Sequence, residues 1–335
     1  MTGRAANVRR SLPLALTVLL LVLFGLLLQR ALSPAPGPVP SGPPPEMPLQ
    51  IVFLDVGQGD AALIRSPEGG LVLIDGGRSG SLVSDYLQEL GVTRLDLVIA
   101  SHADLDHIGG LAEAVRAFAP RYYLDNGVPH STQAYARLLE AVEEADATYL
   151  EAERRTITLG SVALHILPPP RENQDQNDNS VGAVLAYGDF RAVFSGDATT
   201  RTQAWWLGRF GEALAGVQLY KAAHHGSSTG DGPGFMRALS PELVVISVGE
   251  SNSYGHPSPE ALASYEAAGA RVYRTDRQGH VTLTVTPGGD WEVATGALPS
   301  WSALAPDPEG PAVESPAVES PGVGSPGVGS EAGVP

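Results

Sequence analysis

The stretch Ser101-His102-Ala103-Asp104-Leu105-Asp106-His107-Ile108-Gly109-Gly110 decides the fold of this chain. Two imidazoles and two carboxylates fall within six residues of it, directly after the apolar run Leu95–Ala100. That run predicts a buried strand, and Leu111–Phe118 predicts a helix after the glycines. Polar side chains this dense at a strand end are costly to desolvate unless something binds them. Imidazole and carboxylate are usual ligands of divalent metals, so the stretch predicts a metal site rather than a solvated acidic loop.

The same stretch resembles the His-x-His-x-Asp-His signature of the metallo-β-lactamase superfamily, with Asp104 where the second histidine is usual. That difference, with Ser101 and the Gly109-Gly110 pair, resembles the hydrolase domain of ComEC-type DNA-uptake channels and its free-standing relatives. The resemblance covers Leu49 to Gly296 and implies an α/β fold, a four-layer αββα sandwich with the metal ligands at one edge. The alternation of predicted strands and helices indicates by itself only a mixed α and β fold.

Further motifs extend the resemblance along the chain. Asp75, in Asp75-Gly76-Gly77, matches an aspartate that orients the metal loop, and Asp197, in Ser195-Gly196-Asp197, matches the bridging aspartate of the superfamily. His224-His225-Gly226 matches the final histidine motif. Adjacent side chains of an extended segment point in opposite directions, so we expect only one of the two histidines to bind metal. We favour His225 as the ligand and His224 as a contact of the substrate or leaving group.

Many members of the superfamily carry a third metal-binding histidine in a loop that this chain fills with Asn177-Asp178-Asn179-Ser180. The ComEC-type pattern resembles Asn-x-Asn-Ser followed by a strand. It implies that Asn179 or Ser180 contacts the substrate or a metal-bound water. A cluster of Asn and Ser in turn and cap positions is the alternative.

Three other residues are candidates for the surroundings of the metal site. Lys221 is the only lysine of the chain and precedes the histidine pair, and we place it in contact with the substrate or with the metal ligands. His256 lies in a Tyr-Gly-His-Pro loop that matches the ComEC-type pattern, and we expect it to line the site. Asp60 follows Gly57-Gln58-Gly59; the residues alone favour a turn or cap role, and the resemblance weakly favours the site.

The resemblance implies two divalent metal ions, zinc and/or manganese, held by two ligand sets that share one aspartate. A mixed set suits zinc, and it comprises Asp106, His107, Asp197 and His225. A carboxylate-rich set favours manganese or magnesium, and it comprises His102, Asp104 and Asp197.

Composition limits the possible partners. The chain has 335 residues and no cysteine, which excludes disulfides and thiolate ligands. Its formal net charge of −16 argues against a broad nucleic-acid-binding face, because phosphate contacts need clustered Lys and Arg. Only 26 residues separate Asp197 from His224, too few for the nucleic-acid-clamping domain of the RNA-processing branch of the superfamily.

These features predict a dinuclear metal-dependent hydrolase, an extracytoplasmic phosphodiesterase or nuclease that acts on single-stranded DNA or a small phosphodiester. We assign catalysis to Asp106, Asp197 and His224 around a metal-bridging hydroxide, since metal lowers the pKa of water from ~15.7 toward ~7. The alternatives are a hydrolase of small esters or β-lactams, a non-catalytic metal-binding accessory of a DNA-uptake or envelope assembly, and an inactive scaffold. The sequence does not identify protein partners.

The two ends of the chain differ in composition from its middle. Arg4, Arg9 and Arg10 precede the apolar run Leu12–Leu28, whose 17 residues are at the short end for a membrane-spanning helix. Proline follows both candidate cleavage sites. We therefore expect a retained single-pass anchor in the cell membrane with the rest of the chain outside the cytoplasm, secretion after cleavage being the alternative. The predicted parts are the anchor 1–32, a Pro-rich linker 33–48, the hydrolase domain 49–300 and a disordered Pro/Gly/Val/Ser tail 301–335.

Overall fold

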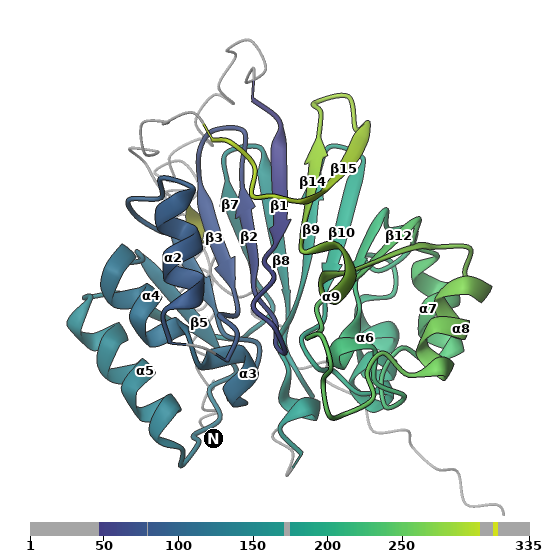
Figure 1. Ribbon diagram of the computed structural model, residues 1–335, viewed down its shortest axis with the longest axis horizontal. Helices are drawn as coiled ribbons and strands as arrows, with labels where there is room; N and C mark the ends of the chain where they lie inside the picture. The colour runs from purple at the N-terminus through teal and green to yellow at the C-terminus, as the bar shows by residue number, and fades with distance from the viewer. Residues whose placement is uncertain (1–46, 79, 171–174, 302–310, 314–335) are drawn as a thin grey trace, which may run out of the picture. The chain divides into compact units, whose positions relative to one another are not determined.

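The structure is a computed structural model that describes residues 47–78, 80–170, 175–301 and 311–313. Two eight-stranded sheets pack face to face in this part of the chain, and helices cover the outer face of each (Figure 1). The predicted αββα sandwich is therefore confirmed.

The first sheet has the strand order β15-β14-β1-β2-β3-β4-β5-β6. Its strands from β3 to β6 run parallel, and the others pair antiparallel. The strands are β1 (Leu49–Phe53), β2 (Ala62–Arg65), β3 (Leu71–Ile74), β4 (Leu97–Ile99), β5 (Tyr122–Asp125), β6 (Thr148–Glu151), β14 (His280–Val285) and β15 (Trp291–Gly296). The helices of this half are α2 (Leu82–Glu89), α3 (Leu105–Ile108), α4 (Leu111–Phe118) and α5 (Gln133–Glu144).

The second sheet has the order β13-β12-β11-β10-β9-β8-β7-β16, with β10 to β13 parallel. Its strands are β7 (Thr156–Leu159), β8 (Val162–Leu167), β9 (Gly182–Tyr187), β10 (Phe190–Phe194), β11 (Leu219–Lys221), β12 (Leu243–Ile246), β13 (Arg271–Arg274) and β16 (Ala312–Val313). The helices are α6 (Thr200–Phe210), α7 (Pro233–Leu239), α8 (Pro259–Ala267) and α9 (Thr275–Gln278), with single 3-10 turns η1 (Asn177–Asn179) and η2 (Ala223–Gly226).

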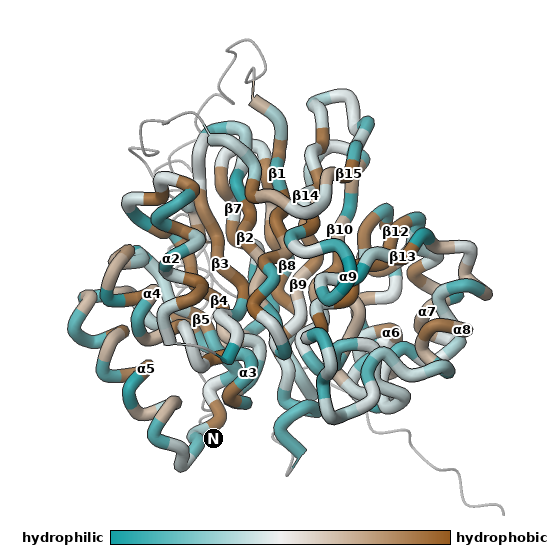
Figure 2. The backbone as a smooth tube through the Cα atoms, in the orientation of Figure 1, coloured by the Kyte–Doolittle hydropathy of each residue, from teal (hydrophilic) through white to brown (hydrophobic). Residues whose placement is uncertain are grey.

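Alternating apolar residues build the core between these layers. In β1, Ile51 and Phe53 face the second sheet, whereas Val52 packs toward the helices α2 and α4. This follows from the two-residue period of a strand, and Figure 2 shows the apolar strands at the centre of the domain. Burial of each such side chain contributes about 1.5–3 kcal/mol. The core therefore fixes the strand ends from which the polar loops extend.

The predictions for the two ends of the chain lie mostly outside this description. The anchor 1–32 and linker residues 33–46 are not among the described residues, nor are 302–310 and 314–335. Among the residues that the structure does describe, no helix is both long and apolar enough to cross a membrane. Within the segment predicted as a disordered tail, however, Ala312–Val313 pairs with β7. Its backbone groups complete the edge of that strand, a long-range pairing that composition cannot reveal.

Candidate metal centre

The metal loop leaves the end of β4 and folds back within one helical turn, α3. This turn, which the sequence did not predict, places the buried rings of His102 and His107 4.1 Å apart. The loop backbone is held from outside: Gly76 N–H donates to the carbonyl of His107 over 2.7 Å.

Glycine is required where the segment after β1 meets this loop. Gly59 has φ of +138°, and a Cβ atom there would lie 2.3 Å from the carbonyl oxygen of Asp106. The next residue, Asp60, donates its N–H to the same carbonyl over 3.1 Å. The Gly-Gln-Gly-Asp segment therefore forms one wall of the metal loop.

Asp75 lies beneath the loop and contacts its polar side chains. Its carboxylate accepts hydrogen bonds from Ser101 N–H at 2.8 Å and from Ser101 Oγ at 2.7 Å. The second of its oxygens lies 2.8 Å from His107 Nδ1. These contacts orient the His107 ring so that Nε2 points away from Asp75, the geometry expected of a residue that orients the loop.

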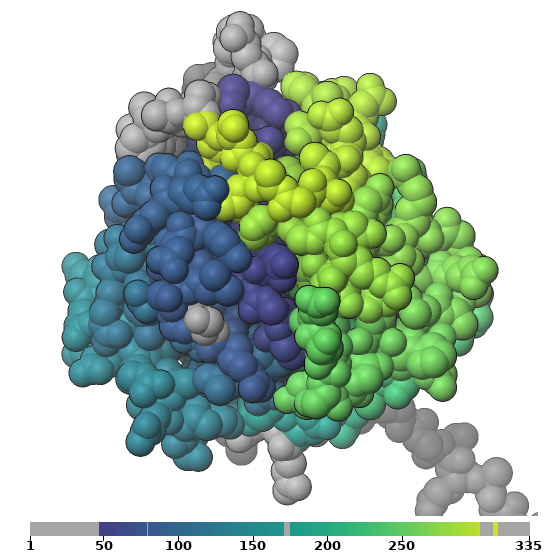
Figure 3. Space-filling view, viewed as in Figure 1, coloured from purple at the N-terminus to yellow at the C-terminus, as the bar shows by residue number. Residues whose placement is uncertain are grey.

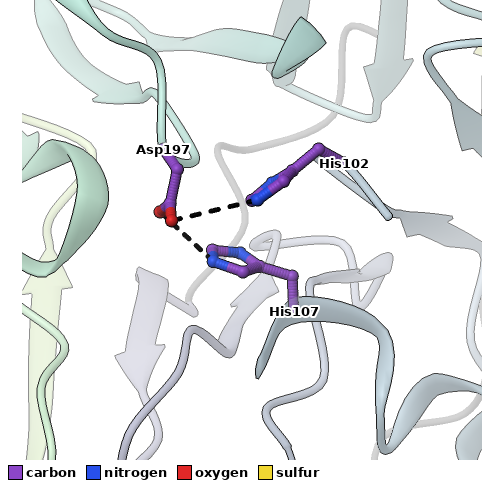
Figure 4. A group of neighbouring side chains, drawn as sticks. All are labelled: His102, His107 and Asp197. Atoms are coloured by element: carbon purple, nitrogen blue, oxygen red, sulfur yellow. Dashed lines mark ion pairs between the residues drawn. The ribbon is translucent and has the colours of Figure 1, made fainter. Parts of the chain in front are cut away.

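Asp197 lies opposite the loop, after the end of β10, and His102 and His107 point toward its carboxylate (Figure 4). Its Oδ1 is 3.2 Å from His107 Nε2. Its Oδ2 is 3.9 Å from Nε2 of His102, 3.7 Å from that of His224 and 3.6 Å from that of His225. Four imidazoles from two separate loops thus surround one buried carboxylate.

The histidine pair does not lie on an extended segment, so the geometric premise of that prediction is wrong. His224 and His225 have φ of +47° and +54° within the turn η2, and both rings face Asp197. They differ in burial: the side chain of His225 is 2% exposed and that of His224 is 24% exposed. His225 Nδ1 contacts the carbonyl of Ser247 at 2.9 Å.

Asp60 belongs to this cluster, although the residues alone favoured a turn or cap role. Its Oδ1 lies 3.1 Å from His225 Nδ1, and its Oδ2 lies 3.7 Å from His107 Nδ1. Lys221 forms an ion pair with the same carboxylate, and both side chains are buried. Lys221 therefore contacts a neighbour of the metal ligands and is closed off from substrate.

The two remaining carboxylates of the loop are more open to solvent. Asp106 Oδ2 lies 3.4 Å from His225 Nε2, and its side chain is 18% exposed. Asp104 Oδ2 lies 3.5 Å from His102 Nε2 with a side chain 42% exposed. Among the described residues, the groups of His and Asp whose ligand atoms all lie within 4.8 Å of one another do not include Asp104. The group that contains His102 and Asp197 has His107 as its third member.

The other predicted residues divide into buried supports and one residue near the surface. Ser180 Oγ accepts a hydrogen bond from Asp197 N–H over 3.1 Å, and the carbonyl of Asn179 accepts one from Asn126. Asn179 and Ser180 are both fully buried, and Ser180 supports the loop that carries Asp197. The ring of His256 packs edge-on against that of His224, with centroids 5.5 Å apart, so it lies at the periphery of the site.

Opposite charges dominate the electrostatics of the cluster. Burial would lower the pKa of His107, but Asp197, Asp75 and Asp60 outweigh it and raise that pKa well above its usual range. Burial would likewise lower the pKa of His225, which Asp197 and Asp60 raise to about 9. Burial would raise the pKa of Asp197, yet the neighbouring imidazoles hold it well below its usual range. The buried carboxylates of the cluster therefore stabilise positive charge placed beside them.

Four buried ligand atoms of the cluster make no hydrogen bond in the described part of the chain. These atoms are Nε2 of His102, His107 and His225 and Oδ1 of Asp197. Unsatisfied buried polar atoms are rare unless an ion or ligand completes them. Two groups of potential ligand atoms lie within 4.8 Å of one another, His102-His107-Asp197 and Asp106-His107-His225. The donor set therefore fits divalent metal.

Residues 54–233 match the family described as the metallo-beta-lactamase superfamily. The chain belongs to this superfamily of metal-dependent hydrolases. The match spans the metal loop, Asp197 and the histidine pair, so the predicted family and enzyme class are confirmed.

Curated relatives of this superfamily protein include competence proteins. It is 30% identical over 248 residues to competence protein ComA of Neisseria gonorrhoeae, covering 73% of this chain and 33% of that protein. It is 27% identical over 254 residues to ComE operon protein 3 of Bacillus subtilis, covering 69% of this chain and 32% of that protein. The chain thus spans about a third of the length of these relatives, and the predicted ComEC-type resemblance is confirmed.

Among solved structures, a mutant of the CmlA beta-hydroxylase is similar in fold. Its TM-score is 0.50 at 16% identity, and the match covers 73% of this chain and 55% of that one. This likeness supports the fold of the superfamily alone.

A buried support of the histidine pair had no signal in the sequence. Asp231 accepts hydrogen bonds from the hydroxyls of Tyr220 and Tyr265 and from the N–H of Ala223, the first residue of η2. It occurs in a Gly-Asp-Gly segment that resembles an ordinary turn. For Asp60, a signal was available: the only lysine of the chain ends a buried strand and requires a carboxylate partner.

Proposed function

We propose that this protein is a dinuclear metal-dependent phosphodiesterase that acts on single-stranded DNA or a small phosphodiester, with zinc, manganese or both as its metals. The observation that carries the proposal is the carboxylate of Asp197, which faces the Nε2 atoms of four histidines at 3.2–3.9 Å. A carboxylate with ligand groups on both sides can serve two cations at once. The competence names of the relatives favour nucleic acid as the substrate class.

The ligand groups form two sets, one for each metal ion. His102 and His107 with Asp197 would hold one ion, and Asp106 and His225 would hold the other together with His107 or Asp197. When bound, the cations would supply a water of lowered pKa as the nucleophile and neutralise charge that develops at phosphorus. Asp75 and Asp60 contact the far ring nitrogens of the histidines, and such contacts orient metal-binding imidazoles.

His224 has the geometry of a substrate contact. Its Nδ1 lies 3.0 Å from the hydroxyl of Thr229, and burial lowers the pKa of its ring. When the hydroxyl donates to Nδ1, the proton of the neutral ring sits on Nε2. The Nε2–H group can then donate a hydrogen bond to the leaving oxygen. We therefore keep the assignment of His225 to metal and of His224 to the leaving group.

Activity of the purified full-length chain tests the proposal. After removal of metal with a chelator, the protein is reloaded with zinc or manganese and assayed with single-stranded DNA, a chromogenic phosphodiester and a β-lactam. We expect metal-dependent phosphodiester turnover that Asp197→Ala abolishes while circular dichroism stays unchanged. Turnover of the β-lactam alone, or full phosphodiester turnover by folded Asp197→Ala protein, contradicts the proposal.

Metal content separates the two histidines. His225→Ala should reduce the bound metal measured by mass spectrometry, because a buried ligand is lost. His224→Ala should keep the metal and lose turnover. Equal metal loss in the two variants would show that both histidines are ligands.

We also propose that a membrane anchor at Leu12–Leu28 leaves the hydrolase domain outside the cytoplasm. The support is the sequence pattern, arginines followed by an apolar run. Protease added to intact spheroplasts should then remove the domain. Full protection of a membrane-associated domain would reverse the orientation, and release of the domain into the medium would indicate a cleaved signal.

A further inference from the structure

A pocket lies where the segment after β1 meets the segment after β12. It has a volume of about 350 Å³ and is lined by Val56 and Gln58 of the first segment, by Arg78 after β3, and by Asn252, Ser253 and Tyr254 of the segment after β12. The two segments are joined by a hydrogen bond from Gly249 N–H to Gln58 Oε1 over 3.2 Å. In Figure 3 the purple surface of the first segment borders the green surface of the second.

A row of aromatic rings connects this pocket to the metal centre. The ring of Tyr254 stacks on that of His256 with centroids 5.8 Å apart and planes 14° apart. His256 packs against His224, whose Nε2 lies 3.7 Å from Asp197 Oδ2. Two ring-to-ring steps therefore lead from the pocket to His224, which contacts the carboxylate of Asp197.

Tyr254 is 57% exposed, the highest value among the large exposed hydrophobic residues that the structure describes. Leu105, in the metal loop, is another of these and is 47% exposed. Two of the most exposed apolar side chains thus lie in the pocket and in the neighbouring metal loop. An aromatic face that is supported on one side and open to solvent is suited to stack on a planar ligand.

Arg78 provides positive charge beside this ring. Its guanidinium donates a hydrogen bond to Tyr254 Oη over 3.4 Å, and the side chain is exposed. The chain carries a formal net charge of −16, so an arginine held at this place is a local exception to its acidity. Guanidinium binds phosphate oxygens in a bidentate manner and stacks on aromatic faces.

We propose that this pocket is a nucleotide subsite, in which Tyr254 stacks on an unpaired nucleobase and Arg78 binds a phosphate next to it. The inference rests on the proposed phosphodiesterase function and specifies its substrate class. A base held on Tyr254 places the neighbouring phosphodiester along the row of rings toward His224. Stacking of this kind tolerates any base but requires that the base be unstacked, so single strands are selected over duplex.

The experiment measures binding of short fluorescent oligonucleotides to the full-length chain. The ligands are a phosphorothioate-linked thymidine oligomer, which resists hydrolysis, and an abasic oligomer with the same backbone. We expect Tyr254→Ala to weaken binding of the thymidine oligomer roughly 5- to 100-fold and to change binding of the abasic oligomer less than about twofold. Tyr254→Phe should keep the affinity, because the aromatic face remains.

Arg78→Gln should weaken binding of both oligomers, since it removes a phosphate contact. The slope of log affinity against log salt should become shallower by about 0.7, the value for one contact with a single strand. Two exposed residues on α5 serve as controls, Arg137→Gln for charge and Leu139→Ala for apolar area, and neither should alter binding. Competition by thymidine monophosphate shows whether one nucleotide suffices.

The outcomes separate this inference from the proposed function. Equal weakening of the two oligomers by Tyr254→Ala, in protein of unchanged melting temperature and metal content, overturns the subsite. Duplex binding as tight as single-strand binding and equally dependent on Tyr254 also overturns it. If phosphodiesters are not hydrolysed but base-dependent binding through Tyr254 persists, the subsite stands and the proposed chemistry fails. If phosphodiesters are hydrolysed but binding does not depend on the base, the proposed function stands and the subsite fails.

Discussion

Replacement of Lys221 by methionine should destabilise the protein far more than loss of a surface ion pair. Lys221 and Asp60 are 3% and 4% exposed, so their ion pair is shielded from solvent. Methionine keeps most of the length of the lysine side chain but leaves the Asp60 carboxylate without its cation. Removal of one partner of a buried pair costs about 3–5 kcal/mol, because the other charge stays buried and uncompensated.

The surroundings of Asp60 act in two directions when metal is absent. The raised pKa values of His107 and His225 keep positive charge beside this carboxylate, which reduces the loss. Asp75 and Asp197 add negative charge within the same cluster, and all three carboxylates lie close to His107. For a domain of this size the loss corresponds to a fall in melting temperature of roughly 6–20 °C. Bound cations would offset part of the excess negative charge, so the fall should be smaller in metal-loaded protein.

Thermal melting of the full-length chain, with chelator and with zinc or manganese, measures both effects. The matched control is Arg116→Met, which breaks an exposed ion pair with Glu144 and should cost at most about 1 kcal/mol. A second variant, Lys221→Met with Asp60→Leu, removes both charges and should recover much of the lost stability. If Lys221→Met melts within the range of the Arg116→Met control, the buried pair does not have the energetic role deduced here.

Three further predictions concern other parts of the molecule. Gly59→Ala should cost roughly 1–3 kcal/mol and reduce bound metal, because its Cβ meets the metal-loop backbone. Gly91→Ala is the control, since its φ is also positive but no atom lies within 4 Å; equal losses in urea midpoint would contradict the argument. Burial and Asp125 raise the pKa of Tyr135 from 10.0 to about 12, so the stability it contributes is present below its unfolded pKa and lost as pH rises through about 12. The part of the tyrosinate absorbance that Tyr135→Phe removes should then appear together with unfolding; its appearance near pH 10.0 in folded protein would refute this. Asp104→His should shift the metal preference toward zinc in a titration of metal-free protein, whereas an unchanged ratio of zinc to manganese activity would show that this carboxylate is not a ligand.

The sequence predicted the centre of the site because it depends on local motifs, and the resemblance carried by those motifs implied the αββα fold. The density of His and Asp after Leu95–Ala100 is unusual enough to indicate metal without any knowledge of distant contacts. Asp197 and the histidine pair could be assigned because each follows a predicted strand in a recognisable motif. Alternating apolar residues marked the strands themselves, which the two-residue period makes visible in one dimension.

Tertiary structure alone decided which polar residues support that centre. Asp60 is a turn residue by its neighbours, and it joins the site only because the segment after β1 lies beside the metal loop and Lys221 approaches from the other sheet. The backbone of His224 and His225 adopts positive φ, which non-glycine residues avoid in isolation. Hydrogen bonds to Asp231, eight residues along the chain from Ala223, and to the carbonyl of Ser247, 22 residues from His225, hold that turn.

The row from Tyr254 to His224 likewise depends on packing between segments. Local sequence determines that a Tyr-Gly-His-Pro loop follows a strand, but not which ring faces which. Arg78 and Tyr254 are 176 residues apart and meet because the two sheets pack face to face. The sequence by itself thus determined a mixed α and β fold through its short-range periodicity, and its motifs determined the metal-binding residue types and the resemblance that implied the αββα sandwich. The supporting shell and the pocket were decided by the tertiary structure, because close packing sets distances between side chains that no local pattern encodes.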